Sequence, residues 1–433
     1  MKTINYKDAD FAETIEILTK REAFPEEITE PVKNILEDIK KRGSSAVIEY
    51  AHKFDSARLD ISSFRVSDDE INEAYNKIDT FTKETIETAI TNVTEFAKKQ
   101  LPKNWNFSPR HGVTLGEKFD PLTRIGVYIP GGTAPLVSTV IHTIAIAKTA
   151  GVKEIAAVTP PGKDALIIPE LLYAMKEAGA TEIYRLGGVY GIGALAYGTE
   201  TIKKVEKIIG PGNAFVTAAK KHVYGDVAID MVAGPSEIMI IADENNNPDF
   251  IAADILSQAE HGSGREHAVL VTNSAELITK VKVSIERQAA KLSRKDPVQA
   301  VLADGVFLIE IKNMEQAVEI ANCYAPEHLE IMCADADNLA LRVKTAGAIF
   351  IGEFTPEPIG DFVAGPSHVL PTGGKARCFS GLTAASFFRR TSLVKYNKQA
   401  LEKEMPAIEK FASMEGLDAH GNSALIRFSN LVI

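Results

Sequence analysis

The alternation of short β-rich runs with helix-length amphipathic runs restricts the fold of this chain more than any other feature of its sequence. A β-rich run over residues 124–129 is followed by a helix-length run from Leu136, and residues 154–159 and 164–179 repeat that order. Strands separated by helices of about ten to fifteen residues favour right-handed crossovers, and hence parallel sheets covered by helices on both faces. The alternation therefore predicts an α/β fold. Further strands are predicted over residues 182–186, 205–209, 227–231, 238–242, 267–272, 306–311 and 348–351.

The two ends of the chain show other patterns. Over the first hundred residues, apolar positions recur at three- and four-residue spacing, which predicts helices. Beyond Ser380 the chain is charged and helical, with no obvious strand except at its short end. This tail is too thin to form a core of its own, so we expect it to dock elsewhere, for example on a partner subunit.

One short motif occurs twice. Residues 230–237 are DMVAGPSE and residues 361–368 are DFVAGPSH, and each segment follows a predicted strand. Two similar turns and an ancient duplication of the α/β half explain this echo about equally well, because short matches are weak.

Size and composition exclude several classes of protein. A chain of 433 residues exceeds what one core usually organises, which predicts two or more domains. Its net charge of -10 gives no general reason to bind nucleic acid or an anionic membrane surface. The N-terminus offers no apolar signal segment, and the apolar stretch over residues 136–152 is too polar to span a bilayer. We therefore expect a cytoplasmic, soluble, multi-domain protein.

The three cysteines are too few, and wrongly spaced, for a disulfide framework or a four-thiolate metal site. Cys323 has apolar helical neighbours, so we expect a packed, inert thiol there.

A candidate metal site lies at the end of the helix predicted over residues 249–260. Gln258 and His261 are three residues apart, so both side chains lie on one helical face and could reach one cation. Alternatively, His261 caps the last carbonyl groups before Gly262.

Glu327 and His328 form a candidate acid–base pair in a loop after Pro326. A carboxylate can activate water, and an imidazole can take up a proton near neutral pH. A solvent-facing loop pair is the alternative.

Three further residues can serve a site or a simpler role. Asp361, in the second AGPS segment, is either a metal ligand or a carboxylate that caps a turn. Glu415 and His420, in the tail segment EGLDAHGNS, either enter a site or decorate a surface loop.

Two glycine-rich stretches match nucleotide-binding loops only in part. The segment over residues 191–196 fits G-x-G-x-x-A, but the acidic residue expected about twenty positions later, at the end of the next strand, is missing. Gly210-Pro211-Gly212-Asn213 lies between a predicted strand and a predicted helix, where helix amide groups could bind phosphate. A tight turn without further use is equally compatible with that segment.

Taken together and in this order, the motifs closely resemble those of the histidinol dehydrogenase family. The resemblance runs from about residue 30 to the C-terminus and rests on RIGVYIPGGTAPLVSTV, IIGPGNAFV, DMVAGPSEIMIIAD, LSQAEHG, YAPEHLEI, GDFVAGPSHVLPTGG and EGLDAHGNS. That family oxidises L-histidinol to L-histidine in two successive NAD-linked steps, the last reactions of histidine biosynthesis. It does so as a homodimer with bound zinc, one ion per subunit.

The resemblance assigns roles to particular positions of this chain. The catalytic pair is Glu327 and His328. The zinc ligands are Gln258, His261, Asp361 and His420. The substrate-binding residues are Ser236, His368 and Glu415, together with His328 and the four metal ligands. The cofactor-binding residues are Tyr128, Tyr190 and Asn213.

This sequence departs from the family pattern at two of these places. Tyr190, in GGVYG, stands where the family usually has Gln, and a phenol cannot reproduce the donor-and-acceptor pair of a primary amide. Ser367 stands where Asn is common.

From the resemblance we expect two Rossmann-like parallel-sheet domains, a helical N-terminal segment and a helical C-terminal tail exchanged in a dimer. The expected division is an N-terminal segment over 1–25, a first α/β domain over 26–127 and 239–382, a nucleotide-binding α/β domain over 128–238, and a dimerisation tail over 383–433. Each active site would then be completed by the tail of the other subunit, with L-histidinol as the substrate.

The residues also fit this chemistry by themselves. His328 has a suitable pKa to accept the hydroxyl proton of an alcohol, and Glu327 can deprotonate the water that adds to the aldehyde. The competing hypotheses are a dehydrogenase for another polyol or amino alcohol, a zinc hydrolase that uses Glu327, and a non-catalytic metal-binding scaffold.

Overall fold

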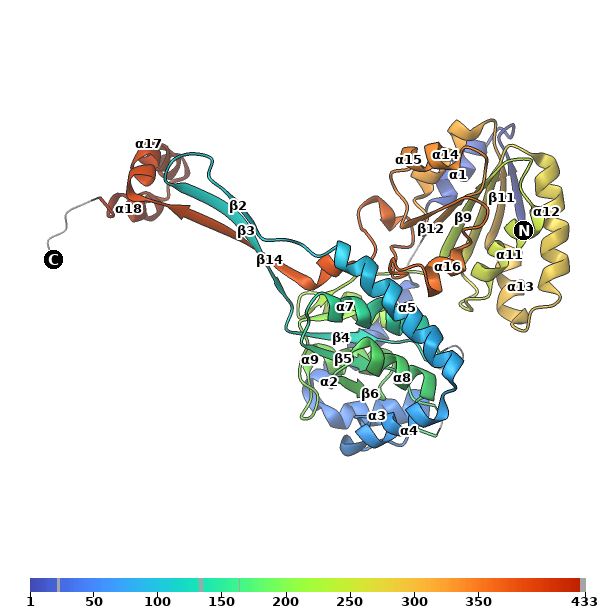
Figure 1. Cartoon of the computed structure of the whole chain (residues 1–433), viewed down its shortest axis with the longest axis horizontal. Helices are drawn as coiled ribbons and strands as arrows, with labels where there is room; N and C mark the ends of the chain where they lie inside the picture. Colours follow the sequence, from blue (N-terminus) through green and yellow to red (C-terminus); the bar gives the residue numbers. More distant parts are fainter. Residues whose placement is uncertain (22–23, 132–134, 163, 429–433) are drawn as a thin grey trace. The chain divides into compact units, whose positions relative to one another are not determined.

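The computed structural model describes the chain except for residues 22–23, 132–134, 163 and 429–433. It divides into two compact units. The first unit comprises Met1–Gln100 and Leu122–Phe387, and the second comprises Leu101–Pro121 and Phe388–Ile433. The predicted α/β fold with parallel sheets is confirmed in the first unit (Figure 1).

The first sheet of this unit has six parallel strands in the order β1-β11-β10-β9-β12-β13. Its central strands are mostly apolar and are buried at nearly every position, as expected for strands covered on both faces. The strands span β1 (Lys2–Asn5), β9 (Glu237–Ala242), β10 (His267–Thr272), β11 (Val306–Glu310), β12 (His328–Ile331) and β13 (Ala348–Ile351).

Helices cover both faces of this sheet (Figure 1). Within β9, Ile238 and Ile240 belong to one buried cluster with α11, α12 and α13, whereas Met239 and Ile241 belong to another with α1, α14 and α15. This two-residue alternation follows from the pleat of a strand. The helices span α1 (Phe11–Leu18), α11 (Pro248–Ala259), α12 (Ala275–Ala289), α13 (Lys295–Asp304), α14 (Met314–Tyr324), α15 (Ala336–Arg342) and the short α16 (Glu357–Phe362).

The second sheet has five parallel strands in the order β6-β5-β4-β7-β8. The chain runs outward from β4 to β5 and β6 and then returns to pair β7 with β4, so β4 is the point at which the strand order reverses. In open α/β sheets, ligands bind at the carboxyl ends of the strands at such a point. The strands span β4 (Arg124–Tyr128), β5 (Glu154–Val158), β6 (Glu182–Tyr184), β7 (Lys207–Ile209) and β8 (Ala228–Ile229).

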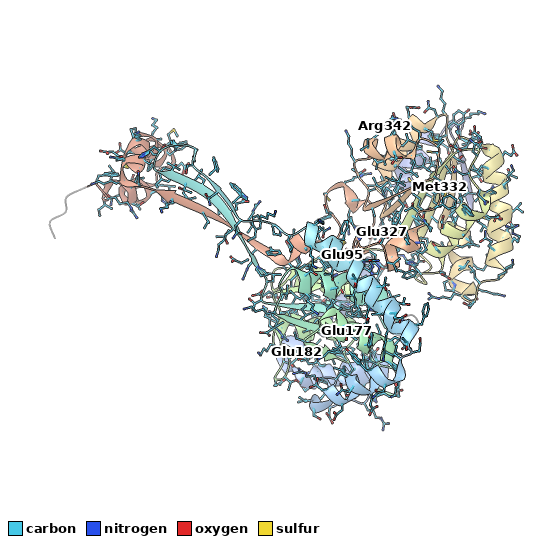
Figure 2. All side chains as sticks on the ribbon, in the orientation of Figure 1. Glu95, Glu177, Glu182, Glu327, Met332 and Arg342 are labelled. Atoms are coloured by element: carbon cyan, nitrogen blue, oxygen red, sulfur yellow. The ribbon has the colours of Figure 1, made fainter. Side chains whose placement is uncertain are left out.

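One face of this second sheet packs against α2, α3, α9 and α10 in a single buried cluster. A charged group holds the amino ends of three strands together: Arg124 pairs with Glu154 at 2.8 Å and with Glu182 at 2.5 Å. Glu182 is labelled in Figure 2. The helices span α2 (Thr29–Arg42), α3 (Ser44–Asp55), α9 (Gly188–Tyr197), α10 (Ala214–Val223), α4 (Asp68–Lys77), α5 (Thr80–Lys99), α8 (Pro169–Ala178) and the continuous segment α6 (Val137–Val140), η3 (Ile141–Ala145) and α7 (Ile146–Thr149). Short 3₁₀ turns occur at η1 (Glu26–Ile28), η2 (Ile61–Ser63), η4 (Lys375–Arg377) and η5 (Ala384–Phe387).

The second unit is an antiparallel sheet with two helices. Its strands lie in the order β14-β3-β2 and span β2 (Trp105–Phe107), β3 (Val113–Pro121) and β14 (Phe388–Tyr396). The helices span α17 (Lys398–Glu415) and α18 (Asp418–Leu425). The described part of the tail, residues 388–428, therefore folds together with residues 101–121.

Five strands lie where none was expected, and they correct the prediction: β1, β2, β3, β12 and β14. β1 lies within the N-terminal segment predicted to be helical, and β14 lies within the tail predicted to lack strands. β1 pairs with β11, about three hundred residues away, and β14 pairs with β3 along nine residues. β12 includes His328, which was predicted to lie in a loop. These strands are fixed by partners that local periodicity does not reveal.

Among the described residues, no helix is both long and apolar enough to cross a membrane. Cys323 is exposed, contrary to the packed thiol expected, because it lies on the outer side of α14.

Candidate active site

Glu327 and His328 are held at the amino end of a central strand. Helix α14 stops at Ala325, whose positive φ of 54° turns the chain, and Pro326 prevents the helix from continuing. β12 then begins at His328, which is paired with Ile238 of β9 and Ala348 of β13. Both Glu327 and His328 are buried, so the alternative of a solvent-facing loop pair is excluded.

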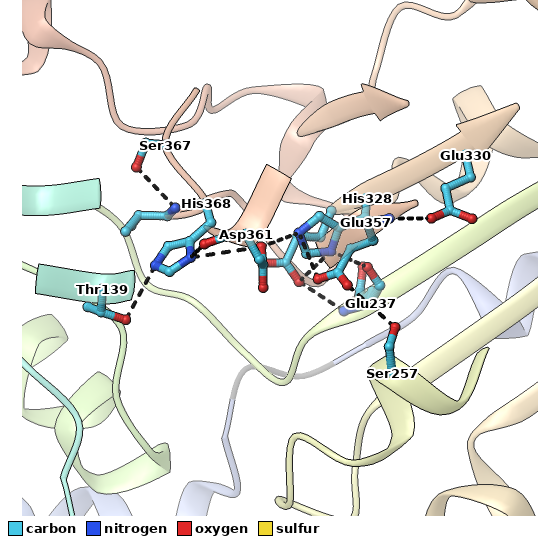
Figure 3. A network of polar contacts seen from close by, with 11 residues as sticks. Thr139, Glu237, Ser257, His328, Glu330, Glu357, Asp361, Ser367 and His368 are labelled. Atoms are coloured by element: carbon cyan, nitrogen blue, oxygen red, sulfur yellow. Dashed lines mark hydrogen bonds and ion pairs between the residues drawn. The ribbon is translucent and has the colours of Figure 1, made fainter. Parts of the chain in front are cut away.

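The main chain of Glu237, the first residue of β9, binds both side chains of the pair. Its N–H donates to Glu327 Oε2 at 2.9 Å, and its carbonyl oxygen accepts from His328 Nδ1 at 3.0 Å (Figure 3). Because a carbonyl oxygen only accepts, Nδ1 carries the proton and Nε2 keeps its lone pair. His328 is thus set as a base at Nε2.

Burial tunes both members of the pair. It lowers the pKa of His328 to about 4, so the imidazole is neutral near pH 7. Burial, reinforced by the neighbouring carboxylates, raises the pKa of Glu327 well above its ordinary value. A carboxylate with a raised pKa is a stronger base once it has lost its proton.

A buried ion pair with Arg21 holds the side chain of Glu237 in place. Arg21 Nε lies 2.6 Å from Glu237 Oε1, and the N–H of Gly373 donates to the same oxygen at 2.9 Å. The guanidinium of Arg21 also stacks on the ring of Tyr324, 3.5 Å from its centroid. Sequence reasoning missed this anchor, because no local pattern links Arg21 to a residue more than two hundred positions away.

Helix α16 brings two carboxylates to the imidazole. Glu357 and Asp361 are four residues apart and share one helical face. His328 Nε2 lies 3.7 Å from Asp361 Oδ1 and 3.9 Å from Glu357 Oε1 (Figure 3). The helix is held at its first residue, where the N–H of Glu357 donates to Glu330 Oε1 of β12 at 2.6 Å.

These carboxylates and His261 form a candidate cation site. One ligand atom from each of His261, Glu357 and Asp361 lies within 4.8 Å of the other two. Burial and the charge of Asp361 raise the pKa of Glu357 to about 9, because both disfavour the charged form of its carboxyl group. Gln258, fully buried near the end of α11, has no hydrogen-bond partner for either amide atom within the described part of the chain.

This donor set fits a divalent cation. Carboxylate oxygen, amide oxygen and imidazole nitrogen suit zinc, and also cobalt or manganese. The structure brings together His261 and Asp361 of the predicted ligands and adds Glu357, which the sequence analysis missed. The signal was present in the four-residue spacing of Glu357 and Asp361 after Pro356.

His368 and Ser236 lie in the same unit as this cluster. His368 Nδ1 donates to the carbonyl oxygen of Asp361 at 3.1 Å, and its Nε2 lies 3.3 Å from the hydroxyl of Thr139 (Figure 3). Its ring stacks on His142 with centroids 4.6 Å apart. Ser236 is half-buried and immediately precedes Glu237, so it lies next to the residue that binds Glu327 and His328.

Ser367 has a structural contact. Its hydroxyl donates to the carbonyl oxygen of His142 at 2.9 Å, which ties the second AGPS segment to the long helix of the other sheet.

Tyr128 and Asn213 lie at the carboxyl ends of β4 and β7. The buried hydroxyl of Tyr128 accepts from the N–H of Gly188 at 3.3 Å. Asn213 is exposed and caps α10, accepting from the N–H of Val216 at 3.1 Å. Gly210 has a φ of 111°, and a Cβ there would overlap the carbonyl oxygen of Tyr128. The GPGN turn therefore needs glycine to approach β4 this closely.

Tyr190 and the G-x-G-x-x-A segment lie inside α9 rather than in a loop. Tyr190 is only 1% exposed, and its hydroxyl donates to Asp55. A Cβ on Gly193 would come within 2.8 Å of Ile39, so this glycine allows α9 to pack against α2. Its role in this segment is helix packing and not phosphate binding.

Glu415 and His420 belong to the second unit. Glu415 is the last residue of α17, His420 lies in the first turn of α18, and both side chains are exposed. His420 and Glu415 are thus available to a contact outside their own unit.

The fold and the site define an α/β oxidoreductase with an imidazole–carboxyl pair beside a cation-binding cluster. The family model described as histidinol dehydrogenase matches residues 18–428, so the chain belongs to the histidinol dehydrogenase family. This confirms the resemblance and the predicted enzyme class, an NAD-dependent oxidoreductase.

Individual relatives agree over nearly the whole chain. The chain is 46% identical over 396 residues to histidinol dehydrogenase of Heliobacterium mobile, covering 92% of each protein. It is 43% identical to histidinol dehydrogenase of Bacillus subtilis, covering 95% of this chain and 96% of that protein. The crystal structure of histidinol dehydrogenase from Elizabethkingia anophelis superposes with a TM-score of 0.93 at 37% identity, covering 99% of this chain and 98% of that one.

Proposed function

We propose that this chain oxidises L-histidinol to L-histidine through the aldehyde, with two NAD per turnover, as the last steps of histidine biosynthesis. The observation that carries this proposal is the buried pair of Glu327 and His328. One main-chain segment fixes both residues, and His328 Nε2 faces the cluster that contains Asp361.

The first oxidation requires a base for the hydroxyl proton. His328 is neutral, its Nδ1 proton is donated to the main chain, and its Nε2 is free to accept the proton as the carbon loses hydride. Burial keeps the imidazole unprotonated before the substrate arrives.

The second oxidation requires water to add to the aldehyde. Glu327, adjacent in sequence and fixed by the same residue, accepts a proton from that water, and loss of a second hydride and a second proton then gives the acid. The two bases act on different protons, so the two oxidations need not share one residue. No thiol is required.

Gln258, His261 and Asp361 would hold zinc, with Glu357 close enough to join them and His420 supplied by the tail of a second copy. When bound, zinc would orient the amino group and imidazole of the substrate beside His328. The orphaned amide of Gln258 supports this assignment, because a fully buried amide without partners is costly unless a ligand satisfies it.

Tyr128, Asn213 and the turn at Gly210 would hold the nucleotide, with Tyr190 contributing from α9. When bound, NAD accepts the hydride. The close approach of Gly210 to β4 supports this placement at the strand where the sheet order reverses.

A homodimer that exchanges the tail is the assembly that we propose. The second unit exposes several large apolar side chains, which is unusual for a surface that stays in water. Ser236 and His368 would bind substrate from the first unit, and Glu415 and His420 from the tail of the other copy. The exposed apolar residues are Trp105, Phe107, Leu393, Val394, Phe411 and Met414.

An anaerobic titration tests the proposal. NADH is counted per histidinol consumed, with a panel of other amino alcohols and polyols as controls. Two NADH per histidinol, with a preference for histidinol over the panel, is expected. One NADH would indicate a simple alcohol dehydrogenase, and turnover without NADH would indicate a hydrolase.

A further inference from the structure

Tyr190 does not present its hydroxyl to the surface. Its ring lies in the buried cluster between the second sheet and α2, α3 and α9, and its single proton is donated to Asp55 Oδ2. The polar group that reaches the surface at this place is therefore the half-buried carboxylate of Asp55.

Asp55 lies at the carboxyl end of the second sheet although it is far away in sequence. It is the last residue of α3, where Ser56 adopts a left-handed φ of 55° and ends the helix. A Cβ built on Gly187, just after β6, would lie 3.2 Å from Asp55 Oδ2 and also touch Pro160, just after β5. Asp55 thus lies close to the residues that follow β5 and β6.

The same edge continues to Tyr128. The N–H of Gly188, next to Gly187, donates to the Tyr128 hydroxyl at 3.3 Å, and Tyr128 ends β4, the strand at which the sheet order reverses. Asp55, the Gly187-Gly188 turn and Tyr128 therefore form one connected group of residues where such sheets bind nucleotides.

We propose that Asp55 binds a ribose hydroxyl of the nucleotide and sets the preference for NAD over its 2′-phosphorylated form, with Tyr190 as the positioning residue for the carboxylate. Doubly wound dehydrogenases use an acidic residue at the end of the strand next to the reversal point for this purpose. In this chain that strand ends in Val158 and is followed by Thr159 and Pro160, with no acidic side chain. The structure provides the carboxylate from α3 instead.

The remaining oxygen of Asp55 is suited to this task. Oδ1 makes no hydrogen bond within the part of the chain that the structure describes, whereas Oδ2 is held by Tyr190. A carboxylate accepts from a ribose hydroxyl and repels a phosphate in the same position. This inference rests on the proposed function only in that it takes a nicotinamide nucleotide as the ligand.

The test measures NAD and NADP binding to the full chain by saturation-transfer NMR without histidinol, and kcat/KM for both nucleotides at saturating histidinol. Asp55→Asn should weaken NAD about tenfold or more while leaving NADP unchanged or tighter. Tyr190→Phe should shift the ratio of NAD affinity to NADP affinity in the same direction but by a smaller factor. Thermal unfolding confirms that each variant is folded.

A second tyrosine–carboxylate pair in the unit, with a buried tyrosine and an exposed carboxylate, supplies the control. The Tyr173 hydroxyl donates to Glu87 at 2.6 Å, so Tyr173→Phe and Glu87→Gln remove a similar bond. Both should leave the NAD-to-NADP ratio as it is. The inference is overturned if Asp55→Asn changes the affinities for NAD and NADP equally, or changes neither. It is also overturned if the wild-type protein binds neither nucleotide. If NAD binding depends on Asp55 but the protein does not oxidise histidinol, only the proposed function is refuted and the inference about Asp55 stands.

Discussion

The two parallel sheets of the first unit use opposite ends of their strands. In the first sheet, Glu237 and His328 are the first residues of β9 and β12, so the buried acid–base group lies at the amino ends. In the second sheet, Tyr128 and Gly210 lie at the far ends of β4 and β7, so the candidate nucleotide turns lie at the carboxyl ends, and the amino ends are closed by Arg124.

The difference shows how the two ends of a strand suit different chemistry. At the carboxyl ends, turns lead into helices whose first N–H groups are free to bind phosphate. At the amino ends of β9 and β12, main-chain groups hold side chains instead, and burial adjusts their pKa values. In this chain the candidate acid–base pair uses the second arrangement, and the candidate nucleotide turns use the first.

Removing the base should have the largest effect. His328→Asn should slow the first oxidation about 10²- to 10⁴-fold, because a positioned base contributes that much. Glu327→Gln should slow mainly the second oxidation. Rates are measured separately with histidinol and with the aldehyde, with zinc content checked in each variant. Equal losses of both steps in both variants would refute the division of labour.

Loss of the ion pair between Arg21 and Glu237 in the first sheet should have the next-largest effect. Arg21→Met leaves Glu237 buried without its partner, which should lower the free energy of unfolding by about 3–5 kcal/mol. Because Glu237 holds both proposed catalytic residues, kcat should fall more than KM rises, and adding Glu237→Gln should restore part of the stability. Chemical denaturation and steady-state kinetics give the two quantities.

The control for this change is an exposed ion pair. Lys280 contacts Glu276 at 2.7 Å with both side chains largely in solvent, so Lys280→Met should cost less than about 1 kcal/mol. Similar losses for Arg21→Met and Lys280→Met would show that Arg21 is not an anchor.

Glu357→Gln tests whether this residue joins the cation site. Loss of one carboxylate should weaken zinc binding at least about tenfold, measured by competition with a chelator. Glu330→Gln, which changes the residue that holds the N–H of Glu357 without altering the cluster itself, should weaken binding less. Equal weakening in both variants would mean that Glu357 acts only through the position of α16.

Substitutions in the second sheet should have smaller effects on function than those in the first. Two glycines with similar backbone angles test this expectation. Gly210 and Gly225 have φ values of 111° and 110°, but only at Gly210 would a Cβ meet another atom, the carbonyl oxygen of Tyr128. Alanine at either position costs about 1–2 kcal/mol of backbone strain. Gly210→Ala should cost more in unfolding free energy and should weaken NAD binding, which Gly225→Ala should leave intact. Equal effects would remove Gly210 from the nucleotide site.

Part of the fold and of the site could be predicted from sequence. Strands such as β9 and β10 are continuous apolar runs, and helices such as α11 have regular apolar spacing, so local pattern specifies them. β12 was missed although HLEI alternates polar and apolar residues, because four residues after a proline are too few to distinguish a strand from a loop. β14 was missed because nearly all of its side chains are exposed, so it carries no apolar period.

The sequence by itself determined the α/β class and the family, and it predicted the candidate site residues Glu327, His328, His261 and Asp361, because each depends on local order along the chain. Only the tertiary structure decided that Glu237 binds both bases, that Arg21 anchors Glu237, and that Asp55 meets Tyr190. These contacts join residues that are about ninety or more positions apart. They exist because burial of the two sheets fixes the strands and helices in space, and burial depends on the whole chain rather than on any segment.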